Sequence, residues 1–159
     1  MTGAVQAEIR LRLATEQDVV FLTDCVVETA KAQGRFPADA DEADYRAGFG
    51  EWTLEQVHGE IPGSTTSVIV VDGEDAGRFR VVRDEGELEL AGLQLMPPWQ
   101  GRGIGAVLLD RLKAEATAAG VPLVLGVEKD NPRARRFYER EGFTWYADDE
   151  RDHRLRWTD

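Results

Sequence analysis

The chain has 159 residues and a single cysteine, so one domain with its own core is expected and an intrachain disulfide is excluded. Its net charge of −11 argues against a nucleic-acid-binding surface and is compatible with a cationic amine as ligand. No apolar run is long enough to cross a bilayer, so no membrane partner is expected. The N-terminus lacks a basic region followed by an apolar stretch, which predicts no signal peptide and a cytoplasmic location.

The first strand and helix can be predicted from their patterns. Apolar residues alternate with arginines over residues 8–13, which predicts a half-buried strand. Thr15, with Asp18 three positions later, is suited to cap a helix that runs to about residue 32. Cys25 has no neighbouring base in the sequence, so we interpret it as a core residue. The buried stripe of this helix is expected to consist of Val19, Leu22, Val26 and Ala30.

The next segment predicts helices, a loop and then a meander. Residues 41–58 read as one or two short helices carrying aromatic residues that either pack the core or line a substrate pocket. These aromatic residues are Tyr45, Phe49 and Trp52. Gly, Pro and Ser make residues 59–67 an expected loop. Three antiparallel strands follow, at 68–71, 78–83 and 87–95, and Asp72-Gly73 belongs to the first turn.

A glycine-dense turn lies between this meander and a long amphipathic helix that ends near Gly120. The turn reads Gln100-Gly101-Arg102-Gly103-Ile104-Gly105. Glycines let backbone N–H groups approach a ligand closely, and the positive end of a helix attracts anions. The turn therefore predicts a site for a phosphate-bearing cofactor.

The remaining segments complete the predicted fold. Residues 121–127 form an apolar run typical of a buried strand, and Asn131-Pro132 begins a helix that reaches about residue 141. A closing hairpin is expected at 143–147 and 153–157. We predict an α/β fold, with a single domain over residues 1–159. Its mixed sheet would have an antiparallel meander followed by a parallel β-α-β unit, with helices on both faces.

Several kinds of site are disfavoured by the sequence. His58 and His153 lie far apart without ligands at metal-binding spacing, so no metal is expected. Residues 101–106 match a dinucleotide-binding pattern, and Glu128 ends the following strand. However, Met96-Pro97-Pro98-Trp99 intervenes between the preceding strand and the turn, and only one β-α-β unit is predicted. A dinucleotide site is therefore the weaker interpretation.

Two blocks resemble the GNAT superfamily of N-acetyltransferases. Gln100-x-x-Gly103-x-Gly105 after a strand and a proline is similar to its acetyl-coenzyme A signature. Residues 131–143 are similar to the second block, N-x-x-A-x-x-x-Y-x-x-x-G-F. The resemblance covers about residues 78–143, and it implies acetyl-coenzyme A as co-substrate. The residues implied to bind it are Leu93, Leu95, Gln100, Gly101, Arg102, Gly103, Ile104, Gly105, Asn131 and Tyr138.

The resemblance also implies a reaction. Acetyl would pass from acetyl-coenzyme A directly to a primary amine, with Tyr138 protonating the departing thiolate. Glu89 stands at a position similar to the base of histone-type members, while Glu128 or ordered water are the alternatives. The acceptor would be a small-molecule or peptide amine, and the closing hairpin and first helices offer surfaces for a homodimer. A non-catalytic acyl-coenzyme A-binding sensor of the same fold is the alternative function.

Overall fold

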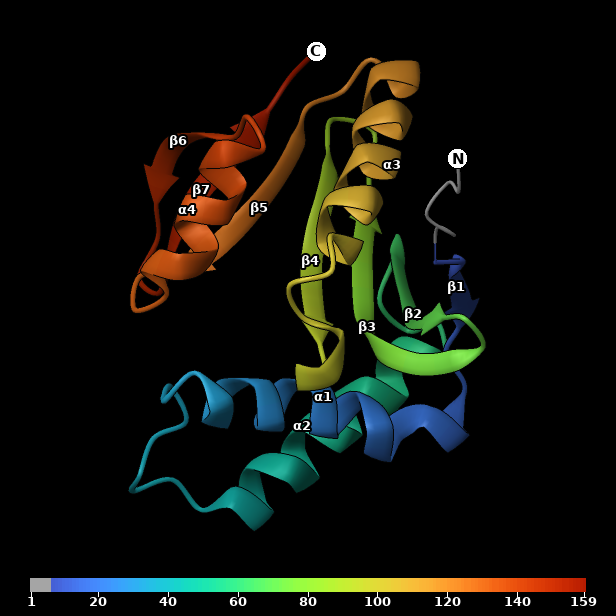
Figure 1. Cartoon of the computed structure of the whole chain (residues 1–159), viewed down its shortest axis with the longest axis vertical. Helices are drawn as coiled ribbons and strands as arrows, with labels where there is room; N and C mark the ends of the chain where they lie inside the picture. The colour runs from blue at the N-terminus through green and yellow to red at the C-terminus, as the bar shows by residue number, and fades with distance from the viewer. Residues whose placement is uncertain (1–6) are drawn as a thin grey trace, which may run out of the picture. The chain divides into compact units, whose positions relative to one another are not determined.

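A computed structural model describes residues 7–159. The N-terminal stretch 1–13, from which no signal peptide was predicted, includes residues 1–6, which lie outside the described residues. The elements are β1 (Ile9–Leu13), η1 (Glu16–Asp18), α1 (Val19–Ala32), α2 (Glu42–Val57), β2 (Ser64–Val71), β3 (Glu74–Arg83), β4 (Leu88–Leu95), η2 (Pro97–Trp99), α3 (Ile104–Ala119), β5 (Leu123–Glu128), α4 (Pro132–Arg140), β6 (Thr144–Asp148) and β7 (Asp152–Trp157) (Figure 1).

The strands form a mixed sheet in the order β1-β2-β3-β4-β5-β7-β6. β1 runs antiparallel to β2, and β7 runs antiparallel to both β5 and β6. β4 and β5, which flank α3 in the chain, are parallel. The predicted α/β fold with a parallel β-α-β unit is therefore confirmed.

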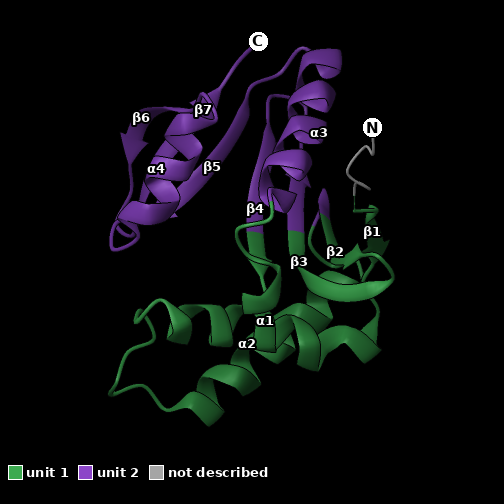
Figure 2. Ribbon diagram, viewed as in Figure 1, with its two compact units in different colours: residues 1–61, 65–79, 93–102 green, residues 62–64, 80–92, 103–159 purple. Residues whose placement is uncertain are grey.

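The contacts of the chain divide it into two compact units, shown in green and purple in Figure 2. Unit 1 comprises residues 1–61, 65–79 and 93–102, and unit 2 comprises residues 62–64, 80–92 and 103–159. β2, β3 and β4 each contribute residues to both units. The site residues predicted from the sequence are thus divided between the units.

The core of unit 1 lies between β2 and α1. Leu22 of α1 clusters with Val68 and Val70 of β2, and all three side chains are buried. Of the predicted stripe of α1, only Leu22 is buried, and Val19, Val26 and Ala30 are partly buried. The buried residues of α1 are Leu22, Thr23, Cys25, Val27 and Thr29. α1 packs against α2 as well as β2, so a wider face is covered than one stripe.

The loop predicted at 59–67 is shorter in the structure, because β2 begins at Ser64. Thr66, the third residue of β2, is buried, and its hydroxyl donates to Gln56 Oε1 over 2.7 Å. β3 also begins earlier than predicted, directly after Asp72-Gly73. Both turn residues have positive φ, 50° and 83°, as a two-residue hairpin turn requires.

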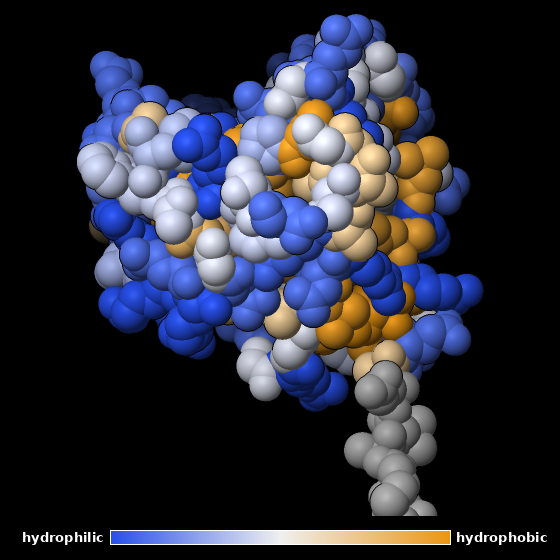
Figure 3. Space-filling model, turned by 90° about the horizontal axis from the view of Figure 1, so that it is seen from above, coloured by the Kyte–Doolittle hydropathy of each residue, from blue (hydrophilic) through white to orange (hydrophobic). Residues whose placement is uncertain are grey.

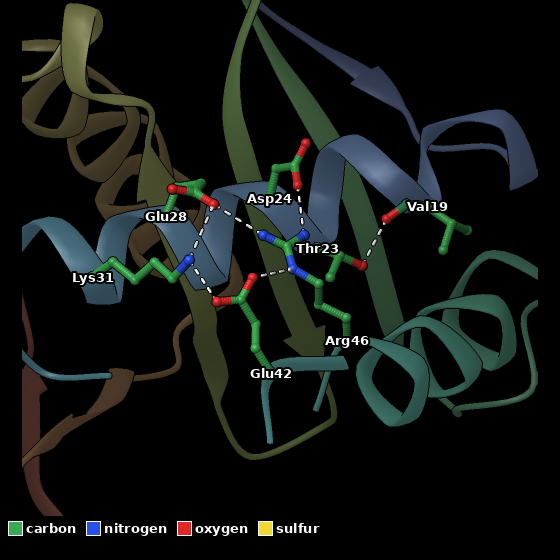
Figure 4. A network of polar contacts seen from close by, with 7 residues as sticks. All are labelled: Val19, Thr23, Asp24, Glu28, Lys31, Glu42 and Arg46. Atoms are coloured by element: carbon green, nitrogen blue, oxygen red, sulfur yellow. Dashed lines mark hydrogen bonds and ion pairs between the residues drawn. The ribbon is translucent and has the colours of Figure 1, made fainter. Parts of the chain in front are cut away.

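A polar network joins α1 to α2 (Figure 4). The guanidinium of Arg46 on α2 donates to Asp24 over 2.7 Å, to Glu28 over 2.9 Å and to Glu42 over 3.0 Å. Lys31 pairs with Glu42 at 2.5 Å. The ammonium of Lys31 and the guanidinium of Arg46 lower the pKa of Glu42. The network fixes α2, which carries the aromatic residues discussed below.

Unit 2 is built around α3 and β5, which contact each other. The buried residues of α3 recur at helical spacing: Ile104, Leu108, Leu109, Leu112 and Ala116. Val107, which was expected on the same face, is 38% exposed. Gly120, with φ of 69°, ends the helix.

The face drawn in Figure 3 is largely hydrophilic, with hydrophobic residues gathered on one side of it. Leu13 of the edge strand β1 is a hydrophobic residue that stays 69% exposed. Within residues 7–159, no helix combines the length and the apolar character that crossing a membrane requires.

Candidate active site

The glycine turn presents open backbone at the start of α3. Gly101 and Gly103 adopt φ of 72° and 77°, which a residue with a side chain rarely adopts. No described atom lies within 4 Å of where a Cβ would be at either glycine, and both residues are exposed. The N–H of Val107 makes the helical bond to Gly103 O at 3.2 Å. The N–H groups that precede it in the first turn have no acceptor within the helix and can serve an anion.

Two side chains of unit 1 support the turn. Gln100 Nε2 donates to the carbonyl oxygen of Leu95 over 2.8 Å. The guanidinium of Arg102 lies over the Trp99 ring, 5.0 Å from its centroid. The stacked ring favours one position of this exposed cation beside the turn, where it suits a phosphate.

Ile104 belongs to the turn in the chain, but its side chain points into the core and is only 2% exposed. Of the groups on Ile104, the backbone N–H is therefore the one suited to an anion. The sequence pattern alone did not separate these two roles of the residue.

β4 leaves β5 before it reaches the turn. The residues paired between these strands are Leu88 to Leu90 with Leu123 to Leu125. β4 nevertheless continues to Leu95. Among the described residues, Leu93 and Leu95 thus follow the part of β4 that pairs with β5. Their backbone is suited to pair with an extended ligand.

Asn131 has a structural role that restricts its chemistry. Its Oδ1 accepts a hydrogen bond from the Ala134 N–H at 3.2 Å and so caps α4. The side-chain amide NH2 is then the group with which Asn131 would contact a ligand.

Tyr138 lies on α4 and is held by two rings of unit 2. Its ring is 5.1 Å from that of Phe137 and 5.7 Å from that of Phe143, both at edge-on angles. Burial raises the pKa of Tyr138, so its hydroxyl stays protonated and can act as a donor at neutral pH.

Glu89 is bonded to a residue that the sequence analysis missed. Arg154 Nη2 on β7 donates to Glu89 Oε2 on β4 over 3.3 Å, and both side chains are partly buried. β5 lies between these strands, and Gly126 is its residue opposite Arg154. An added Cβ at Gly126 would lie 2.9 Å from Arg154 Nη1 and 2.7 Å from Asp152 Oδ2. A lone glycine in the apolar run 121–127 was the available signal, because it marks a close approach.

Asp152 adds a second carboxyl group beside Gly126. Burial raises its pKa, and the neighbouring charges of Asp149 and Glu128 raise it further. Asp152 lies opposite Glu128, the alternative base, in the register of β5 and β7. No local pattern singles out Asp152, which follows a turn of charged residues.

The aromatic residues of α2 form a continuous row in unit 1. Tyr45 stacks on Phe49 at 6.2 Å, and Phe49 meets Trp52 edge-on at 5.6 Å. Tyr45 and Trp52 stay partly exposed at the ends of this row. Arg78 of β3, only 3% exposed, places its guanidinium 5.3 Å from the Phe49 centroid and 6.0 Å from that of Trp52. A guanidinium thus already lies against two of these aromatic rings.

Of the predicted site residues, Gln100 and Leu95 are in direct contact, whereas Glu89 contacts Arg154 from outside the predicted set. Both histidines are paired with carboxylates, His58 with Glu16 and His153 with Asp148. Among residues 7–159, no group of three His, Cys, Asp or Glu side chains is arranged to hold a metal ion.

The sequence matches a family model over most of the chain and matches curated relatives over shorter stretches. The family model described as "Acetyltransferase (GNAT) family" matches residues 28–143. An uncharacterized N-acetyltransferase of Mycobacterium tuberculosis is 39% identical over 74 residues, which are 45% of this chain and 47% of that protein. A mycothiol acetyltransferase of Beutenbergia cavernae is 47% identical over 60 residues, 37% of this chain and 20% of that protein. The matched region thus spans about half or less of these relatives.

Solved structures share the fold over nearly the whole chain. PaiA N-acetyltransferase from Thermoplasma acidophilum, solved in complex with coenzyme A, has a TM-score of 0.78 at 20% identity. The match covers 96% of this chain and 99% of that one. An aminoglycoside acetyltransferase solved with coenzyme A and kanamycin has a TM-score of 0.69 at 20% identity, with 95% of each chain covered.

Proposed function

This chain belongs to the acetyltransferase (GNAT) family, and we propose that it transfers acetyl from acetyl-coenzyme A to a primary amine. The observation that carries the proposal is the glycine turn at the start of α3, with positive φ at Gly101 and Gly103 and open space above both. Such a turn fits the pyrophosphate of the co-substrate, because its backbone donors are accessible and lie at the positive end of a helix.

The rest of the donor site is assigned residue by residue. Backbone groups of Gln100 to Gly105, together with the Arg102 cation, would bind the phosphates. The backbone of Leu93 and Leu95, beyond the register paired with β5, would bind the pantetheine arm as a neighbouring strand does. The amide NH2 of Asn131 would contact the same arm, since its Oδ1 caps α4.

In the proposed reaction the amine attacks the thioester carbonyl carbon directly. Glu89 takes the proton that the amine loses, directly or through water. The carbon–sulfur bond breaks, and Tyr138 protonates the departing sulfur. An N–H near Leu95 stabilises the charge on the carbonyl oxygen. Glu128 or ordered water remain the alternatives for the base.

The acceptor belongs to the class of small-molecule or peptide amines. The net charge of the whole protein, −11, favours an acceptor that is a cation. The guanidinium of Arg78 already lies beside the rings of Phe49 and Trp52. These two rings of α2 therefore add nothing to the preference for a cationic acceptor.

A panel of amines tests the proposal against the alternative, a non-catalytic acyl-coenzyme A sensor. The protein is mixed with acetyl-coenzyme A and each amine, and the release of coenzyme A thiol is followed. Binding of acetyl-coenzyme A is measured separately by calorimetry. Thiol release that depends on an amine supports the enzyme. Tight binding without release for every amine supports the sensor, and absence of binding contradicts both.

A further inference from the structure

A charged cluster spans three neighbouring strands of unit 2. Glu89 lies on β4, Gly126 on β5 and Arg154 on β7, and the order of these strands in the sheet is β4-β5-β7. Glu89 is opposite Val124 in the register of β4 and β5, and Arg154 is opposite Gly126 in the register of β5 and β7. The ion pair between Glu89 and Arg154 therefore crosses β5.

Gly126 makes this crossing sterically feasible. With a Cβ at this position, Arg154 Nη1 would be 2.9 Å away and Asp152 Oδ2 2.7 Å away, both closer than carbon normally approaches such atoms. The other residues of β5 are larger and mostly buried, from Leu123 to Val127. The only residue of β5 without a side chain thus lies under the arginine.

Arg154 itself is held from more than one side. A hydrogen bond to Tyr146 of β6 and the charge of Glu89 raise the pKa of Arg154 against the opposing effect of burial. Arg80 of β3 brings a second positive charge toward Glu89 and donates from Nε to Ser64 Oγ over 3.0 Å. Glu89 thus interacts with the guanidinium of Arg154 on β7 and with the charge of Arg80 on β3. The planar guanidinium of Arg154 can orient the carboxylate of Glu89.

We propose that Arg154 is the positioning residue of Glu89, and that Gly126 leaves the space in which the Arg154 side chain lies. Arg154 binds Oε2 and so orients Oε1 as the atom that takes the proton from the acceptor amine. Arg154 acts through Glu89 and contacts neither substrate. This inference rests on the proposed function and on Glu89 as its base.

A double-mutant cycle tests the proposal. Arg154→Met, Glu89→Gln and the double variant are compared with the wild type for kcat and for the KM of both substrates. Arg154→Met is expected to lower kcat about tenfold, with both KM values nearly unchanged, because orientation of the base is lost while binding is kept. In the Glu89→Gln background the same substitution is expected to have no further effect, because its target is already removed.

Two further variants separate positioning from general damage. Gly126→Ala keeps every charge but displaces the arginine, so it should lower kcat in the wild type and leave Glu89→Gln unaffected. Arg10→Met is the control, since Arg10 is an exposed arginine of β1 whose ion pair is with Glu8. It should retain wild-type kcat. Melting temperatures are recorded for every variant, and Gly126→Ala replaces Arg154→Met if the latter does not fold.

The outcomes are distinct. Equal effects of Arg154→Met with and without Glu89 would overturn the positioning role, as would wild-type kcat in Glu89→Gln or in the Arg154→Met variant. The proposed function fails in a different way, because wild-type protein that binds acetyl-coenzyme A would then release no thiol with any amine.

Discussion

Gln100 bonds the glycine turn to the end of β4: its Nε2 donates to the carbonyl oxygen of Leu95 over 2.8 Å. Leu95 belongs to the part of β4 that lies beyond the register paired with β5. One side chain therefore connects the segment proposed to bind the pyrophosphate with the strand proposed to bind the pantetheine arm. Within unit 1, this hydrogen bond joins Gln100 directly to the end of β4.

Removing this connection should weaken donor binding. Gln100→Ala is expected to raise the dissociation constant of coenzyme A by about three- to tenfold, corresponding to a lost hydrogen bond of about 1 kcal/mol. Isothermal titration calorimetry measures the change. Substitution of the exposed Gln17 of η1 serves as control and should leave the affinity as it is. An equal affinity in both variants would show that the bond to Leu95 does not organise the site.

The two left-handed glycines that flank α3 provide a matched pair. Gly103 and Gly120 have φ of 77° and 69°, and neither has a described atom within 4 Å of a Cβ position. Alanine at either position should cost roughly 1 kcal/mol of unfolding free energy, because only the backbone is strained. Gly103→Ala alone should also weaken coenzyme A binding, since the turn relaxes and must be restored on binding. Chemical denaturation and calorimetry measure both quantities. Similar binding by the two variants would move the phosphates away from the turn.

Tyr138→Phe removes the proposed acid and keeps the ring that contacts Phe137 and Phe143. We expect kcat to fall about 10- to 100-fold while the affinity for acetyl-coenzyme A is retained. Steady-state kinetics and calorimetry give the two quantities. An unchanged kcat would remove Tyr138 from the mechanism and leave it a packing role.

Cys25 should be chemically inert in the folded protein. Its side chain is fully buried, and burial raises the pKa of the thiol to about 12. Alkylation by iodoacetamide at pH 8 should therefore require unfolding, and mass spectrometry follows it because the chain has one cysteine. Cys25→Ala should retain acetyl transfer and lose about 1 kcal/mol of stability. Rapid alkylation of the native protein would contradict the buried position.

Asp18 should make the protein sensitive to acid. Burial raises its pKa, but hydrogen bonds from Arg12 at 2.9 Å and from the Thr15 N–H at 2.8 Å outweigh burial, so the pKa is lowered overall. A carboxyl with a lowered pKa in the folded state stabilises the protein above its unfolded pKa, about 3.9, and this contribution is lost as the pH falls through the folded pKa.

Asp18→Asn tests this linkage. The variant should lose about 1–3 kcal/mol of unfolding free energy at pH 7 and show a weaker fall in stability below about pH 4. Urea unfolding across this pH range measures both effects. Asp75→Asn is the control, because Asp75 pairs with the same Arg12 at 3.2 Å but is exposed, so a smaller loss is expected. Equal losses of unfolding free energy in the two variants would mean that burial of Asp18 does not increase its contribution to stability.

Local patterns predicted most of the fold. Residues 104–119 repeat their apolar positions at helical spacing, and the structure buries most of them, with Val107 exposed. The prediction of the buried residues of α1 was less accurate, because it assumed that only one face of the helix is covered by other elements. Threonines at 23 and 29 are buried in that helix, which is feasible because their hydroxyls donate to carbonyls of Val19 and Cys25 in the preceding turn.

The start of β2 shows another limit of local patterns. Gly, Pro and Ser in residues 59–67 predict a loop, yet Thr66 is buried in a strand. Gln56 of α2 supplies the partner for its hydroxyl, ten positions earlier in the chain. A polar residue can be buried when a partner far away in the sequence forms its hydrogen bond. The residues next to it in the sequence do not reveal that partner.

By itself the sequence determined the mixed α/β class, the parallel β-α-β unit and the glycine turn, because spacing and glycine content act locally. Tertiary structure alone decided that Arg154 crosses β5 to reach Glu89 and that Gln100 contacts Leu95. It also decided that the Ile104 side chain lies in the core, so that only its backbone is available to a ligand. Strand order and register bring these groups together across up to 65 positions of sequence, and pairing at that distance depends on the folded sheet.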